Sequence, residues 1–141
     1  MTIEEKLKEV VTVGMPDMAY VLGTLTEIDE KLDLLRPPFV WVVFPELGTL
    51  TYRMGRWKES FRALVGFFDL TGRDADGEDN MATYRRMVGR AKEFIEAYNA
   101  SGFFEPIEGD IQTAIHAEVG AANVTGLMID LVIKERRSVC G

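Results

Sequence analysis

The hydrophobic and polar positions of this chain predict helices at the start, then three strands, one long helix and two closing strands. The longest helical pattern begins at Asp79 or Asn80 and ends before Gly102. Apolar side chains recur in it at steps of three and four, a spacing that places them on one stripe of a helix. They are Met81, Tyr84, Val88, Ala91, Ile95 and Tyr98. A helix with one apolar stripe must cover an apolar surface, and the flanking strand-like segments are the candidates.

The first residues predict a short helix over residues 2–13. Thr2 has Glu5 three residues after it, the spacing of a capping box. Gly14 and Pro16 then favour the end of the helix. The expected apolar stripe of this helix is Ile3, Leu7, Val10 and Val11.

Two shorter patterns follow this first helix. Met18–Leu22 is an apolar run that fits either a helix or a strand. Thr26 begins a second helical pattern, which Pro37 and Pro38 bring to an end. The apolar stripe of that second helix is Ile28, Leu32 and Leu35.

Five segments have the β-branched, aromatic or alternating pattern of strands. They are Phe39–Phe44, Thr49–Met54, Phe61–Leu70, Asp110–Val119 and Leu127–Glu135. Residues 55–60, which contain Trp57, are expected to form a polar connection, and residues 71–79 and 120–126 to form loops. Strands therefore run together before and after one long helix. This order predicts a single α+β domain over residues 1–141, with a mainly antiparallel sheet, helices on one face, and the other face or an edge free for a partner.

Composition and charge narrow the class of protein. The 141 residues carry a net charge of -7, which gives no general attraction to nucleic acid or to anionic membranes. The longest strongly apolar run, Phe39–Phe44, is too short to span a bilayer. The one cysteine, Cys140, excludes an internal disulfide, and the first ten residues lack the apolar run of a signal peptide. We therefore expect a soluble protein of the cell interior that binds neither membranes nor specific nucleic acid.

No residue pattern indicates catalysis, a cofactor or a metal. His116 is the only histidine, and neither a catalytic serine motif nor a glycine-rich phosphate loop is present. In the acidic loop from Asp74 to Asp79, Gly77 is the fourth residue and Arg85 would be the twelfth, so the spacing of a calcium loop fails. Glu105 and Glu108 have the chemistry of an acid–base pair, but their spacing does not single them out. The sequence predicts a protein that is not an enzyme.

The candidate functional residues are those of an interface. Trp57 and Phe61 flank charged residues at the entrance to a strand, and aromatic side chains in such places often anchor partners. Arg85, Arg86 and Arg90 form a basic stretch, interrupted by glutamates, that favours a solvated or subunit-contact face over a nucleic-acid site. Across subunits, these arginines would meet acidic loops such as Asp74–Asp79.

Four stretches resemble small prophage-encoded proteins of tailed phages: MTIEEKLKEV at the start, Pro37-Pro38-Phe39-Val40, AYNASGFFEPIEGDI over residues 97–111, and Asn123–Ile129. The order of elements is similar to that of tail-terminator and tail-completion proteins of the phage neck. The resemblance implies a non-enzymatic subunit that forms a ring, such as a hexamer, on the tail tube. It also implies contacts with tail-tube and head-completion proteins, first in the bacterial cytoplasm and then in the virion. No functional residue can be carried over from it.

Two other classes of protein stay open. A small cytoplasmic protein-binding or regulatory module could have the same α+β form. An enzyme with an unrecognised site is the weakest alternative, because nucleophile–base and metal patterns are absent from the sequence.

Overall fold

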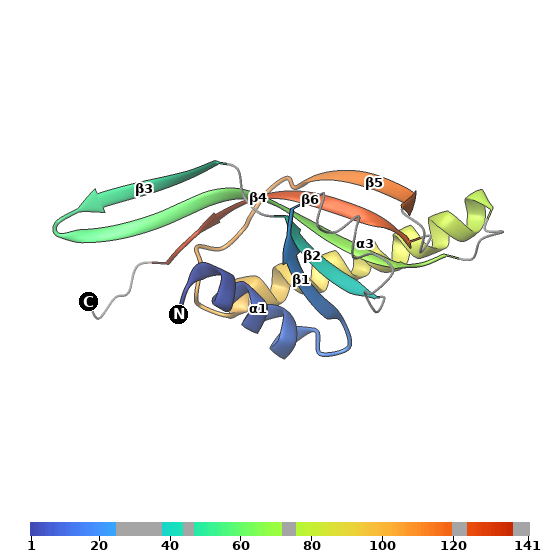
Figure 1. Ribbon diagram of the computed structural model, residues 1–141, viewed down its shortest axis with the longest axis horizontal. Coiled ribbons are helices and arrows are strands. Elements are labelled where there is room, and N and C mark those ends of the chain that lie inside the picture. The colour runs from blue at the N-terminus through green and yellow to red at the C-terminus, as the bar shows by residue number, and fades with distance from the viewer. Residues whose placement is uncertain (25–37, 44–46, 72–75, 120–123, 137–141) are drawn as a thin grey trace.

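The computed structural model describes residues 1–24, 38–43, 47–71, 76–119 and 124–136. These residues form a six-stranded, mostly antiparallel sheet with two helices packed on one face (Figure 1). The predicted α+β class is confirmed. The elements are α1 (Ile3–Gly14), β1 (Ala19–Gly23), β2 (Phe39–Val43), β3 (Leu47–Arg53), β4 (Arg56–Leu70), α3 (Gly77–Ala100), β5 (Gln112–Val119) and β6 (Val124–Lys134).

The sheet is built around the long strand β4. Its strand order is β1-β2-β4-β6-β5, and β3 pairs with the part of β4 that β2 does not reach. β1 lies parallel to β2, which makes Met18–Leu22 largely a strand and adds a sixth strand to the five expected. Parallel neighbours need a crossover connection. The helix predicted from Thr26 falls in that connection, outside the described residues.

Helix α1 forms as the pattern predicts. The Thr2 hydroxyl accepts a hydrogen bond from the Glu5 amide at 3.2 Å, which caps the first turn. The four residues of the predicted stripe are all buried. At the other end, a β-carbon added to Gly14 would lie 2.7 Å from the β-carbon of Ala97. The absence of a side chain at Gly14 therefore lets α1 cross close to α3.

Helix α3 begins earlier than predicted. It starts at Gly77, and its N-cap is Asp76 rather than Asp79 or Asn80. The Asp76 carboxylate accepts from the Asp79 amide at 2.9 Å, and the Asp79 carboxylate accepts from the Asp76 amide at 3.2 Å. This reciprocal capping box satisfies free amides of the first turn, so the last part of the expected loop is helical. The other end is as predicted, with Gly102 in the left-handed conformation at φ 75°.

The face that α3 buries differs from the predicted stripe. Its buried residues are Thr83, Met87, Ala91, Phe94 and Tyr98, of which the prediction included two. Tyr84, Val88 and Ile95 are half-buried at the margin of the core, and Met81 is 43% exposed. Phe94 occupies the centre, with its ring 5.5 Å from that of Phe67 on β4. The helix thus packs on the sheet as expected, but rotated about its axis.

The connection predicted over residues 55–60 is wrong. The chain turns at Met54 and Gly55, whose φ angles of 52° and 78° fit the two-residue turn of a tight hairpin. Arg53 pairs with Arg56 across this turn, and β4 then continues without interruption to Leu70. Residues 55–60 therefore complete a hairpin whose two strands run beyond the rest of the sheet.

The ends of the last two strands also shift. β5 begins at Gln112 rather than Asp110. β6 begins at Val124, inside the expected loop, and ends at Lys134, while Glu135 forms an isolated bridge with Phe104. The Thr71 and Thr125 hydroxyls meet at 2.8 Å between β4 and β6, which satisfies two buried polar groups near the start of β6.

Both faces of the sheet bury apolar side chains. The face under α1 and α3 holds the larger cluster, with Val65, Phe67 and Ile129 among its members. The opposite face holds a second cluster: Phe39, Trp41, Phe68, Val124 and Met128, which are 1–7% exposed. The expectation that the face opposite the helices is free is therefore wrong at these residues, although Leu64 and Val132 on the same face are 40% and 54% exposed. Further exposed apolar side chains lie on the β3–β4 hairpin and at Ile115 on β5.

Candidate interaction surface: the β3–β4 arm

The hairpin formed by residues 47–60 is called the arm. Figure 1 shows it projecting beyond the rest of the sheet at one end of the long axis. Register explains the projection, because the ladder between β4 and β6 ends at Ser60 paired with Lys134. Beyond it, the Glu135 amide donates to the Glu59 carbonyl, and the Lys58 ammonium is ion-paired with Glu105. The tip has no neighbouring strand other than its own partner within the described chain.

The two faces of the arm differ in chemistry. Residues paired across an antiparallel ladder point to the same face. One face, called the apolar face, carries Leu50, Tyr52 and Trp57, which are 66%, 59% and 69% exposed, together with Glu59 opposite Leu50. The other, called the basic face, carries Thr49, Thr51, Arg53, Arg56, Lys58 and Ser60. The hairpin is therefore amphipathic, although its apolar face meets water.

The apolar face is already ordered within the chain. The Tyr52 and Trp57 rings lie 4.8 Å apart between centroids at an interplanar angle of 46°. Aromatic pairs of this kind add about 0.5–1.5 kcal/mol beyond the area that they bury. Met54 extends the apolar surface to the turn, where it is 95% exposed. Contiguous apolar patches of this kind mark interaction sites more often than single exposed side chains do.

The arm carries a net positive charge, although the net charge of the whole chain is negative. Its three cations and one carboxylate give it a net charge of +2, so the rest of the chain, whose total is -7, carries -9. Lys58 is engaged, and its hydrogen bond holds the pKa of Glu105 below its usual range. Arg53 and Arg56 form no ion pair with any described residue. The tip therefore presents two free guanidinium groups beside its aromatic pair.

The structure separates the two aromatic residues predicted as anchors. Trp57 is exposed on the arm, as an anchor must be. Phe61 is 7% exposed and packs in the main core, so it is wrong as a surface anchor. The reason lies in the register, because Phe61 is opposite Ile133 of β6 and points to the face that the helices cover.

The three arginines predicted as interface residues lie on α3, away from the arm. Figure 1 shows the start of α3 and the turn of the arm at opposite ends of the long axis. The Arg85 guanidinium lies over the Tyr84 ring at 5.5 Å, and Arg86 is 3.6 Å from Asp69. Arg90 is paired with Asp17 and Glu93. Burial opposes the charge of Arg90, but these two carboxylates more than compensate and raise its pKa.

These arginines therefore do not form one patch with Trp57. Two of them already have carboxylate partners within the chain. In the acidic loop that was expected to meet these arginines across subunits, Asp76 and Asp79 cap their own helix. Residues 74 and 75 of that loop lie outside the described residues.

The remaining candidate residues from the sequence are His116 and Cys140. His116 is exposed on β5, with its ring 6.4 Å from that of Phe68. Cys140 lies outside the described residues. Among the residues that the structure describes, no group of three or more histidine, cysteine, aspartate or glutamate side chains is placed to hold a metal ion. Within the same ranges, no helix has the length and apolar character needed to cross a membrane.

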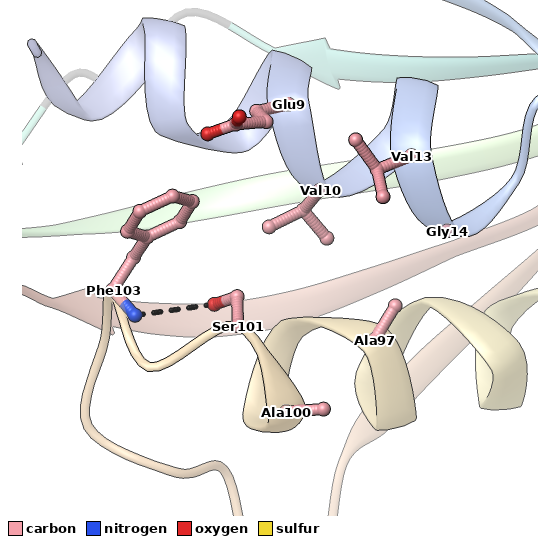
Figure 2. A pocket seen from close by; sticks show the side chains of 8 residues that line it. All are labelled: Glu9, Val10, Val13, Gly14, Ala97, Ala100, Ser101 and Phe103. Atoms are coloured by element: carbon pink, nitrogen blue, oxygen red, sulfur yellow. Dashed lines mark hydrogen bonds between the residues drawn. The ribbon is translucent and has the colours of Figure 1, made fainter.

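A groove between α1 and the end of α3 contains one of the buried polar groups that lack a hydrogen-bond partner among the described residues. Figure 2 shows Val10 and Val13 across from Ala97 and Phe103. These side chains line a space of about 370 Å³. One carboxylate oxygen of Glu9 is buried there without a hydrogen-bond partner among the described residues. The Ser101 hydroxyl, the other polar side chain of the wall, is engaged by the Tyr98 carbonyl and the Phe103 amide. One carboxylate without a second free polar group does not orient a small ligand.

The arm is the candidate site that the chain presents most openly, and the sequence revealed only its Trp57. The pattern that could have indicated it is the alternation of charged residues with Trp57 after Met54-Gly55. No protein-family model matches this chain, and no curated protein is similar to it in sequence.

Proposed function

We propose that this protein is a non-enzymatic structural subunit of a tailed phage or prophage, a tail-terminator or neck protein that assembles into a ring on the tail tube. The observation that carries the proposal is the exposed apolar face of the arm. A projecting hairpin that turns Leu50, Tyr52 and Trp57 toward water is stabilised when a second molecule covers it.

The composition of the arm supports a protein partner. Tryptophan, tyrosine and arginine are the residue types most enriched where interfaces concentrate their binding energy. The arm presents all three types within a few residues of its turn, namely Trp57, Tyr52, Arg53 and Arg56. Because the two rings already contact each other, binding would lose less side-chain entropy than two free rings would.

The charge of the molecule supports the assembly proposed. Excluding the arm, the chain carries -9, so a ring of such subunits does not attract DNA that passes through it. The proposed partners are other copies of this chain, the tail-tube protein and a head-completion protein. The protein would fold in the cytoplasm of the bacterial host and enter the virion.

The test is the oligomeric state of the purified protein over a concentration series, with and without the tail-tube protein of the same phage or prophage. Sedimentation velocity and light scattering would follow assembly. We expect closed oligomers, and we expect Trp57→Ala to weaken assembly by roughly 30-fold, the effect of removing one central aromatic side chain. Val13→Ala is the matched control, because Val13 is 74% exposed on α1 and is not part of the arm.

A strictly monomeric protein in every condition, without binding to tail-tube protein, would refute the proposal. Binding of the arm to an unrelated cellular protein, with no self-association, would instead support the small binding module. In that outcome Trp57→Ala would weaken the binding of that other protein.

A further inference from the structure

A second exposed apolar surface lies at the far edge of the sheet, between α3 and β5. It is a groove of about 370 Å³, lined by Tyr84, Val88 and Ile95 from the helix and by Ile111, Thr113 and Ile129 from the sheet side. It exists because α3 rests on Met87 and Phe94 and leaves this side of the helix half-buried. Ile115 on β5 lies on the same face of the sheet and is 55% exposed.

The groove runs beside an open sheet edge. β5 is the last strand of the sheet and, among the described residues, pairs only with β6. On the arm, β3 likewise pairs only with β4. Each strand therefore has one edge with backbone groups available for pairing. Such edges are commonly covered by another strand, from the same or a second chain.

We infer that the arm of one copy binds the α3–β5 groove of a second copy, with β3 added to the β5 edge. The inference rests on the proposed function, because it presumes that the chain self-associates, and it names the two surfaces involved. Strand addition continues both faces of the sheet into the added strand. In the orientation favoured by burial, Leu50, Tyr52 and Trp57 cover Ile111 and Ile115, while the basic face of the arm points the other way.

The lengths of the two surfaces match. From Tyr84 to Ile95 the groove follows eleven helical residues, or about 16 Å at the rise of an α-helix. From Leu50 to Arg53, the last residue of β3, the arm follows three strand residues, or about 10 Å, and the exposed side chain of Met54 extends its apolar surface into the turn. One arm therefore covers most of one groove.

The charges at the start of β5 are complementary as well. Glu108 and Asp110 precede β5 at the Ile95 end of the groove, and both are exposed and form no ion pair with a described residue. The wall of the groove on α3 carries charges of both signs, from Arg85, Lys92 and Glu96. Arg53 and Arg56, the free guanidinium groups on the basic face of the arm, supply the charge opposite to that of Glu108 and Asp110. A second copy of this chain therefore offers both an apolar strand for the groove and cations for the carboxylates that precede β5.

The contact is head-to-tail, because it joins two different surfaces. A contact of this type builds a ring when the rotation between copies closes, and an open chain when it does not. Each subunit would donate one arm and receive one arm, so every arm in a closed ring would be covered.

The experiment exchanges charges between the two surfaces. One variant is Arg53→Glu with Arg56→Glu, and the other is Glu108→Arg with Asp110→Arg. All four positions are exposed, so circular dichroism and thermal unfolding should match the wild type. Each variant alone would place like charges on both surfaces, and we expect its self-association to weaken at least tenfold at low salt.

An equimolar mixture of the two variants would again bring opposite charges together at every contact. We expect the mixture to recover oligomers of wild-type size, with the two variants alternating. If either variant assembles as well as the wild type, or if the mixture stays dissociated, the arm–groove contact is refuted while ring formation by the wild type still stands. A wild-type protein that never self-associates refutes both the contact and the proposed function.

Discussion

Replacing Phe94 with alanine tests which face of α3 packs on the sheet. Phe94 is fully buried, with ring centroids 5.5 Å from Phe67 and 5.9 Å from Tyr98. A buried phenylalanine removes about 150–250 Å² from water, worth roughly 4–6 kcal/mol at about 25 cal/mol per Å². Alanine retains part of that burial but leaves a cavity. We therefore expect the free energy of unfolding to fall by about 3–5 kcal/mol, out of about 5–15 kcal/mol for a domain.

Urea denaturation followed by circular dichroism would measure this loss. Ile95→Ala is the matched control, because Ile95 is the next residue on the helix but is only half-buried at the groove. It should cost about 1–2 kcal/mol, since little of its side chain leaves a filled core. If Phe94→Ala proves too unstable to fold, Phe94→Leu keeps most of the volume and should still cost more than Ile95→Ala.

An Ile95→Ala variant that loses as much stability as Phe94→Ala, or more, would contradict this orientation of α3. It would favour instead the stripe that the sequence pattern alone suggests, centred on Val88, Ala91 and Ile95. The groove beside β5 would then not exist in the form described.

Two further predictions concern stability. Gly126→Ala should cost at least about 2–3 kcal/mol in urea denaturation, because its β-carbon would lie 1.8 Å from the Phe67 carbonyl oxygen and push β4 and β6 apart. Gly89→Ala, in open space on α3, should instead stabilise the protein by about 0.5–1 kcal/mol. If both substitutions changed the free energy of unfolding in the same direction, the close contact between β4 and β6 at Gly126 would be contradicted. Burial, and to a smaller degree the charge of Glu4, raises the pKa of Tyr20 to about 12, so the folded chain holds this proton more tightly than the unfolded chain, where the pKa is about 10. The contribution of Tyr20 to the free energy of unfolding is present below about pH 10 and is lost as the pH rises to about 12, by roughly 2–3 kcal/mol. Tyr20→Phe should therefore reduce the loss of stability at alkaline pH relative to the wild type in unfolding experiments.

The sequence by itself determined the elements whose burial is uniform along their length. α1 has one stripe and one cap, so periodicity and the Thr2 side chain place it within a residue of the observed helix. β2 is apolar on both faces because both faces of the sheet are covered there, and the run Phe39–Phe44 reflects that directly. The α+β class follows from the order of these elements.

Only the tertiary structure decided the orientation of α3. Its sequence contains two overlapping apolar stripes, one through Val88 and Ile95 and one through Met87 and Phe94, which share Ala91 and Tyr98. Both have helical spacing, so periodicity cannot choose between them. The choice depends on the shape of the sheet, where Phe67 offers an aromatic surface to Phe94.

The arm is the other feature that local pattern could not give. Alternation of apolar and polar residues marks a strand because one face is buried, but residues 56–60 have no core beneath them. They are a strand because β3 satisfies their backbone groups, a contact that appears only once the hairpin has formed. The same pairing separates the two predicted anchors: it carries Trp57 out into water, while β6 holds Phe61 in the core.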